Sequence, residues 1–187
     1  MYHSAYQDGD AVEVLSSAGK DPAAAWKITG KIVRVYDKGV KGFVQVVSGG
    51  ATTRMQLPPQ VKGTLGLRQR YLVIQVFTHS STDRPFSIEL GVTDAGGTRR
   101  RLVFSSAFRA LHCTPLHAQI PLACQGRHRG KWANLSMDLV GLTSMCFRAD
   151  PFRSLDLIAV GPACRIRSIF TMRGVLPQQE WSEGGGG

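Results

Sequence analysis

The stretch YLVIQVFT, residues 71–78, carries the strongest secondary-structure signal in the chain. It is a short, almost continuous run of β-branched, aromatic and other apolar residues, which favours a strand over a helix. A strand without apolar–polar alternation is typical of one covered on both faces. The run therefore predicts a central strand of a β-rich core.

Shorter segments of the same character recur on both sides of this run. AVEVLS (residues 11–16) and KIVRVYD (residues 31–37) alternate apolar and polar side chains, as half-buried strands do. Gly-bearing connections at 38–40 and 94–97 predict hairpins. Strands at this spacing indicate an all-β antiparallel sandwich or barrel, and the remaining ones are expected at residues 42–47, 53–57, 86–93, 99–105, 118–122, 131–137, 155–160 and 165–171.

Helical signals are few. Asp138 is a good N-cap for a short helix over residues 139–147, and the segment from Pro22 to Trp26 is a candidate for one more helical turn. We expect one sandwich domain over residues 1–175. Residues 176–187, which end in four glycines, have the composition of a flexible tail or the start of a linker.

The chain is basic, with 23 Lys and Arg against 13 Asp and Glu and a formal net charge of +10. The excess is concentrated after residue 98, where 12 basic residues face 5 acidic ones. Such a balance indicates an acidic partner, which could be nucleic acid, an anionic membrane or an acidic protein surface. A solvated basic face without a partner is the alternative.

Three basic clusters stand out. Arg99, Arg100 and Arg101 open a predicted strand, so Arg99 and Arg101 should share one face while Arg100 faces the other. Residues 127–131 read as a basic loop that contains Arg127, Arg129 and Lys131. Arg165 and Arg167 alternate with an isoleucine and are expected on the solvent side.

Cysteines and histidines raise the possibility of a metal site. Cys113, His117, Cys124 and His128 are residue types that zinc prefers, but their spacing is not that of a zinc knuckle. No export signal and no membrane-length apolar run is visible, so we expect reduced, metal-free thiols in a reducing compartment.

The search for catalytic motifs predicts no enzyme. The chain has no G-x-S-x-G elbow, Walker loop, G-x-G-x-x-G fingerprint or H-E-x-x-H pair, and its carboxylates are scattered. We therefore expect no cofactor. Trp26 and Trp132 could serve as sugar-stacking platforms in a jelly-roll module, but large aromatic side chains are more often core anchors.

Several stretches resemble the domain of the cilia- and flagella-associated protein 20 family, and CTPLHAQIPL (residues 113–122) and WKI (26–28) look closer to its larger domain-containing members than to the founding single-domain protein. The stretches that carry the family resemblance are SSAGKDPAAAWKITG (residues 16–30), TLGLRQRYLVIQV (64–76), GTRRRLVFSS (97–106), KWANLSMDLVGL (131–142) and ACRIRSIFTMR (163–173), in the family's order. The C-R-I-R strand and the T-L-G-L segment are the more specific of them.

The resemblance implies a jelly-roll-like β-sandwich with one short helix and no catalytic residues. It also implies a structural protein of the ciliary or flagellar axoneme, basal body or centriole. Such a protein would bind tubulin and help to join or stabilise microtubules and neighbouring axonemal proteins. Tubulin surfaces are acidic, so we expect the contact to be made by Arg99, Arg101, Arg127, Arg129 and Lys131.

Two other functional classes stay open on sequence grounds. A nucleic-acid-binding β-domain fits the charge, although the basic clusters have mainly aliphatic neighbours rather than the aromatic residues that stack on bases. An enzyme or a sugar-binding module on a jelly roll would require a concave face with exposed tryptophans or paired carboxylates.

Overall fold

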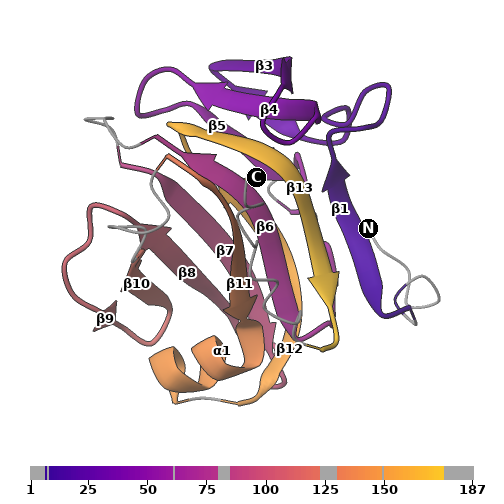
Figure 1. The fold of residues 1–187 in the computed structure, drawn as a ribbon. Coiled ribbons are helices and arrows are strands. Elements are labelled where there is room, and N and C mark those ends of the chain that lie inside the picture. The colour runs from indigo at the N-terminus through magenta and orange to yellow at the C-terminus, as the bar shows by residue number, and fades with distance from the viewer. Residues whose placement is uncertain are drawn as a thin grey trace, which may run out of the picture.

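The computed structural model describes residue 7 and residues 9–60, 62–79, 85–122, 130–148 and 150–174. Two β-sheets pack face to face, and a single described helix closes one end of the pair (Figure 1). This confirms the predicted β-sandwich with one short helix.

The first sheet contains the strand that the apolar run predicts. β6 (Tyr71–Thr78) lies between β11 (Trp132–Asp138) and β13 (Cys164–Met172), so it is central in its sheet. β4 (Gly42–Ser48) and β3 (Lys31–Asp37) continue the sheet as the predicted hairpin. The far end of β13 pairs instead with β1 (Ala11–Ser16). All of these pairs are antiparallel.

The second sheet has seven strands. Their order is β2 (Lys27–Thr29), β5 (Arg54–Leu57), β12 (Phe152–Val160), β7 (Ser87–Asp94), β8 (Arg99–Ser105), β10 (His117–Pro121) and β9 (His112–Cys113). β7 and β8 form the second predicted hairpin. β2 and β9 were not predicted, because two or three exposed residues give no periodic signal.

One pair of strands departs from the expected antiparallel arrangement. β10 runs parallel to β8, from His117 beside Arg101 to Pro121 beside Ser105. The connection after β8 leads to β9 at the edge of the sheet, and β9 pairs antiparallel with β10. The alternation of side chains is the same in both directions, so sequence periodicity could not predict this direction.

The core lies between the inner faces of the two sheets. Leu72 and Ile74 of β6 face Ile88 and Leu90 of β7, and all four side chains are fully buried members of one apolar cluster. Burial of each such side chain contributes about 1.5–3 kcal/mol. Trp26 belongs to the same cluster, which confirms the prediction that it anchors the core.

Helix α1 (Leu139–Phe147) forms where the sequence predicts it. The Asp138 carboxylate accepts a hydrogen bond of 3.1 Å from the Gly141 amide, which satisfies one of the free N–H groups of the first turn. Leu139, Cys146 and Phe147 are buried against the sandwich. The segment from Pro22 to Trp26, by contrast, forms only turns, so the predicted helical turn is wrong there.

Candidate partner-binding surface

The three arginines that open β8 alternate as the sequence predicts. Arg99 and Arg101 are exposed on the outer face of the second sheet. Arg100 points inward, and its side chain is only 11% exposed. The hairpin therefore presents two of its three cations to solvent.

Arg100 has a structural role at the end of the sandwich. Its Nε and Nη2 atoms donate hydrogen bonds of 2.9 and 2.6 Å to the Asp94 carboxylate. The guanidinium also donates to the Pro115 carbonyl and lies 5.3 Å from the centre of the Phe147 ring. It thus links the β7–β8 hairpin to the following loop and to the last residue of α1.

Ion pairs keep two carboxylates of the fold ionised, Asp94 and Asp37. Burial disfavours ionisation of Asp94, but hydrogen bonds from Arg100 and from the Thr98 amide outweigh it, and the pKa of Asp94 lies below its usual value. The same balance lowers the pKa of Asp37, where Nη1 of Arg165 donates at 2.9 Å. Both groups are therefore ionised and paired at neutral pH.

The two exposed arginines of the hairpin differ in their surroundings. Arg101 forms an ion pair with Glu89 at 2.9 Å, and Glu89 also contacts Arg54 at 3.4 Å. Arg99 has no ion pair among the described residues, and it donates a hydrogen bond of 3.3 Å to the Gly63 carbonyl. Its positive charge is therefore more available to a partner than that of Arg101.

The remaining predicted site residues are not all described. Arg127 and Arg129 lie outside the described residues. Lys131 is exposed directly before β11, at the end of that strand away from α1 (Figure 1). Arg99 lies in the other sheet, one residue from the arginine that contacts α1. The structure therefore brings Arg99 and Arg101 to one face but places Lys131 at the other end of the molecule.

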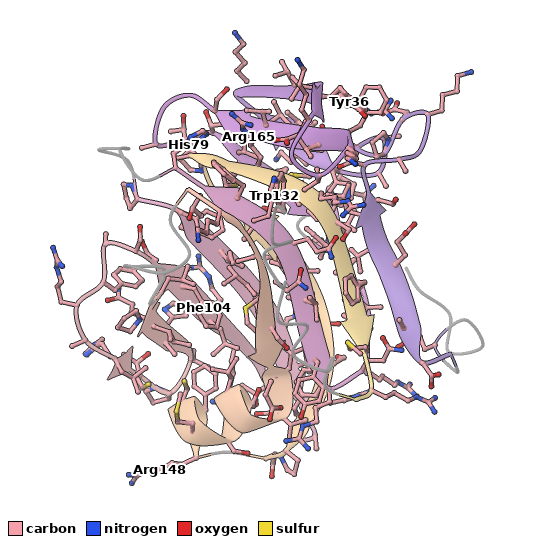
Figure 2. The ribbon with its side chains drawn as sticks, viewed as in Figure 1. Tyr36, His79, Phe104, Trp132, Arg148 and Arg165 are labelled. Atoms are coloured by element: carbon pink, nitrogen blue, oxygen red, sulfur yellow. The ribbon has the colours of Figure 1, made fainter. Side chains whose placement is uncertain are left out.

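An aromatic cluster lies beside Lys131 on the outer face of the first sheet. The Phe77 ring is 5.8 Å from Trp132 and 5.1 Å from His79, and the Arg165 guanidinium lies 5.2 Å from its centre. Figure 2 shows Trp132, Arg165 and His79 gathered in the upper part of this face. Trp132 is thus a half-buried member of a surface cluster and not a core anchor, which corrects the prediction made for it.

The same cluster separates Arg165 from Arg167. Arg165 is half-buried in its ion pair with Asp37, whereas Arg167 is exposed. A register shift between Ile166 and Ser168 breaks the simple alternation of β13. Both arginines lie on the outer face of the sheet, as predicted, but Arg165 is half-buried because it pairs with Asp37 and lies over the Phe77 ring. Burial, and the charge of Arg165, lower the pKa of His79, so its imidazole is neutral at pH 7.

With the fold and these surfaces in place, comparison with known proteins decides the family. A family model described as the CFA20 domain matches residues 1–184. The chain belongs to the CFA20 domain family. Membership associates this CFA20 domain with cilia and flagella in general, in agreement with the resemblance found in its sequence.

The chain is also similar to several solved structures. The chain is 13% identical, with a TM-score of 0.41, to a Clostridium thermocellum endo-1,4-β-D-xylanase 10B structure with CBM22-1 and GH10 modules, covering 88% of this chain and 28% of that one. The C-terminal family 22 carbohydrate-binding module of the same xylanase is 13% identical, with a TM-score of 0.38 and coverages of 85% and 92%. An exo-β-agarase is 11% identical, with a TM-score of 0.44 and coverages of 87% and 25%. This CFA20 domain thus spans about a quarter of the xylanase and agarase chains.

The cysteines of this CFA20 domain have contrasting environments. Cys113 is exposed, and Cys146 and Cys164 are buried free thiols. Burial and the neighbouring Cys113 thiol raise the pKa of Cys146 to about 12. Cys124 and His128, which belonged to the hypothetical metal cluster, lie outside the described residues. Among the residues that are described, no group of three metal-ligating side chains occurs.

Among the hollows of the described surface are two of about 410 and 440 Å³. The smaller of them is apolar and opens where β8 and β10 face β11 and α1, and Phe104, Ile120, Leu135 and Met145 are among its lining residues. The larger is polar and lies at Arg99, between the β7–β8 hairpin, the start of β12 and the segment before β6. Sequence analysis missed both, because each is lined by segments far apart in the chain. No described helix is long and apolar enough to cross a membrane.

Proposed function

We propose that this CFA20 domain is a non-catalytic structural component of the ciliary or flagellar axoneme that binds microtubules through exposed cations. In this role it would help to join or stabilise microtubules and neighbouring axonemal proteins. Family membership supports the ciliary setting. The distribution of charge over the described surface supports an acidic partner.

That distribution is the observation that carries the proposal. Asp37, Glu89, Asp94 and Asp138 are each engaged in an ion pair within the fold. The exposed acids of the described chain, Asp10, Glu13, Asp21 and Asp150, are far fewer than its exposed lysines and arginines. Asp156 is buried. Arg99 and Lys131 remain exposed without an ion pair among the described residues. An excess of exposed positive charge attracts an acidic lattice and accelerates encounter with it.

Many weak ion pairs, repeated along a microtubule, can together give measurable binding. A single exposed ion pair contributes about 0.2–1 kcal/mol, because water and salt screen it. Several pairs in one interface could change the affinity by about tenfold for every 1.4 kcal/mol. Binding to a repeating lattice adds avidity without new contacts.

Co-sedimentation with microtubules tests the proposal. The purified protein should pellet with microtubules at low ionic strength and less strongly at moderate ionic strength, because salt shortens the range of exposed charges. A variant with Arg99, Arg101, Arg127, Arg129 and Lys131 changed to Glu should not pellet. A second variant that keeps Arg101 avoids loss of the Glu89 pair and guards against a folding defect.

Thermal unfolding of the same protein preparations shows whether the variants are folded, and a DNA-binding assay tests the nucleic-acid alternative. The variant that keeps Arg101 should keep the thermal midpoint of the wild type, since its altered residues that the structure describes are exposed and form no ion pair there. The five-residue variant should stay folded with a slightly lower midpoint, because it loses the Arg101–Glu89 pair. Normal pelleting of a folded five-residue variant would show that these cations do not mediate binding. If the wild type ignores microtubules but binds duplex DNA, and the variant loses DNA binding, the protein is a nucleic-acid-binding domain instead.

A further inference from the structure

The polar hollow at Arg99 gathers cations from three separate parts of the chain. Lys62 and Arg68 come from the segment between β5 and β6, Arg99 begins β8, and Arg153 lies near the start of β12. All four side chains belong to exposed residues. Within the described part of the chain, none of them forms an ion pair. Four like charges around one hollow repel one another, and an anionic ligand would relieve that repulsion.

Backbone hydrogen bonds hold the walls of this hollow in place. The segment before β6 runs alongside β12, because the Leu65 and Leu67 amides donate at 3.1 Å to the carbonyls of Asp156 and Leu155. Leu155 returns a bond of 2.7 Å to Leu67. On the other wall, Arg99 reaches across to the Gly63 carbonyl. The hollow is thus preformed, which lowers the ordering cost of binding.

The floor of the hollow carries one carboxylate, Asp156, that is already satisfied. Its oxygens accept hydrogen bonds from the Gly66 amide at 3.2 Å, from the Ser154 hydroxyl at 3.2 and 3.3 Å, and from the Thr93 hydroxyl. These two hydroxyls are therefore occupied as donors, and the negative charge of Asp156 disfavours a dianion placed deep in the hollow. The available charge lies instead at the rim, on the four cations.

The nature of the ligand follows from this arrangement. Spaced cations at the rim of a hollow of about 440 Å³ match several singly charged carboxylates along an extended segment better than one compact phosphate. We propose that this hollow is a docking site for an acidic, glutamate-rich peptide segment of the partner. The proposal deepens the proposed function, since it names the chemistry by which the microtubule partner would be recognised.

A charge-matched pair of variants tests the site. The cavity variant changes Lys62, Arg68, Arg99 and Arg153 to Gln. The control variant changes Lys20, Lys27, Lys31 and Lys38 to Gln, which removes the same charge from exposed residues that do not line the hollow. Lys27 and Lys31 begin β2 and β3, and β3 lies at the end of the sandwich away from α1 (Figure 1). The probe is a synthetic glutamate-rich peptide, titrated into each protein and followed by calorimetry.

Peptide affinity should fall at least about tenfold in the cavity variant and change by no more than about twofold in the control variant. In the wild type, the amide resonances of Gly66 and Gly97, which both line the hollow, should shift on addition of peptide. Equal losses in both variants would show that attraction is merely global and would overturn the proposal. Shifts confined to other residues would also overturn it.

A competition experiment with inorganic phosphate tests whether the hollow binds a peptide or a small anion. It should not compete with the peptide at comparable concentration, and saturable phosphate binding at Gly66 and Gly97 without peptide binding would refute the peptide assignment. Because the assay contains no microtubules, its outcome is separate from that of co-sedimentation. If the peptide binds but the protein does not pellet with microtubules, the docking site stands and microtubule binding is refuted. If the protein pellets but does not bind the peptide, microtubule binding stands and the docking site is refuted.

Discussion

At the level of single residues, Arg100 shows how one position of a basic run acquires a structural role. Its neighbours face solvent, while its own side chain is paired with Asp94, which is fully buried. Removing one member of a buried pair leaves the other charge without compensation. Changing Arg100 to Leu should therefore lower the free energy of unfolding by on the order of 3 kcal/mol. Urea denaturation of both proteins measures the difference.

The same pair has a pH signature. The pKa of Asp94 in the folded protein is lower than its ordinary value of 3.8. Its stabilising effect is therefore present above pH 3.8 and is lost as the pH falls through the lower, folded value. In the Arg100→Leu variant the backbone hydrogen bond from Thr98 remains, but the hydrogen bonds and the charge of Arg100 no longer oppose burial, so the pKa of Asp94 should rise and the penalty should be greatest at neutral pH. The difference in stability between the two proteins should shrink as the pH falls toward 3, and a constant difference would refute this assignment.

At the level of elements, α1 depends on a cap that also carries an ion pair. The Asp138 carboxylate accepts from the Gly141 amide and from Nε and Nη2 of Arg70 at 3.0 and 2.6 Å. Hydrogen bonds from Arg70 are the largest cause of its lowered pKa. Changing Asp138 to Ala should cost about 1 kcal/mol of unfolding free energy through the lost cap.

A conservative change separates the two roles of Asp138. Asn keeps an acceptor for the Gly141 amide but lacks the charge, so Asp138→Asn should recover most of the stability lost in the Ala variant. Thermal or urea unfolding of the two variants in parallel makes the comparison. Equal losses in both would assign the stabilising effect to the Arg70 pair and not to the cap.

The longer strands and the helix could be predicted from local sequence patterns. The apolar run of β6 and the alternation of β8 fix their bounds, since both patterns depend only on neighbouring residues. The direction of β10 and the short strands β2 and β9 depend on pairing between distant segments. Local pattern carries no information about such pairing.

The residues of the candidate site also differ in whether local sequence patterns could predict their positions. Period-two alternation predicted that Arg99 and Arg101 share a face, and the structure confirms this. The Glu89 partner of Arg101 could not be predicted, because it requires the register of the β7–β8 hairpin. The hollow that joins Lys62 to Arg153 could not be predicted either, because it requires the segment before β6 to pair with β12.

At the level of the whole molecule, the net charge of +10 reflects exposed cations that outnumber the exposed acids Asp10, Glu13, Asp21 and Asp150 of the described chain. Ion pairs within the fold occupy Asp37, Glu89, Asp94 and Asp138. Exposed cations are spread over both ends of the sandwich, with Lys131 at one end and the rim of the polar hollow at the other. Either end of the sandwich could meet an acidic partner on charge alone, and the preformed hollow favours the end that contains Arg99.

The most direct test of the account is the microtubule affinity of three proteins measured side by side. They are the wild type, the variant neutralised at Lys62, Arg68, Arg99 and Arg153, and the matched variant neutralised at Lys20, Lys27, Lys31 and Lys38. Co-sedimentation would be carried out at about 0.01 M and about 0.15 M ionic strength, between which the Debye length falls from about 30 to about 8 Å. The account predicts that the wild type and the matched variant pellet with similar affinity, more tightly at the lower ionic strength, while the cavity variant stays in the supernatant. Pelleting of the folded cavity variant with wild-type affinity, or no pelleting of the wild type at either ionic strength, would contradict it.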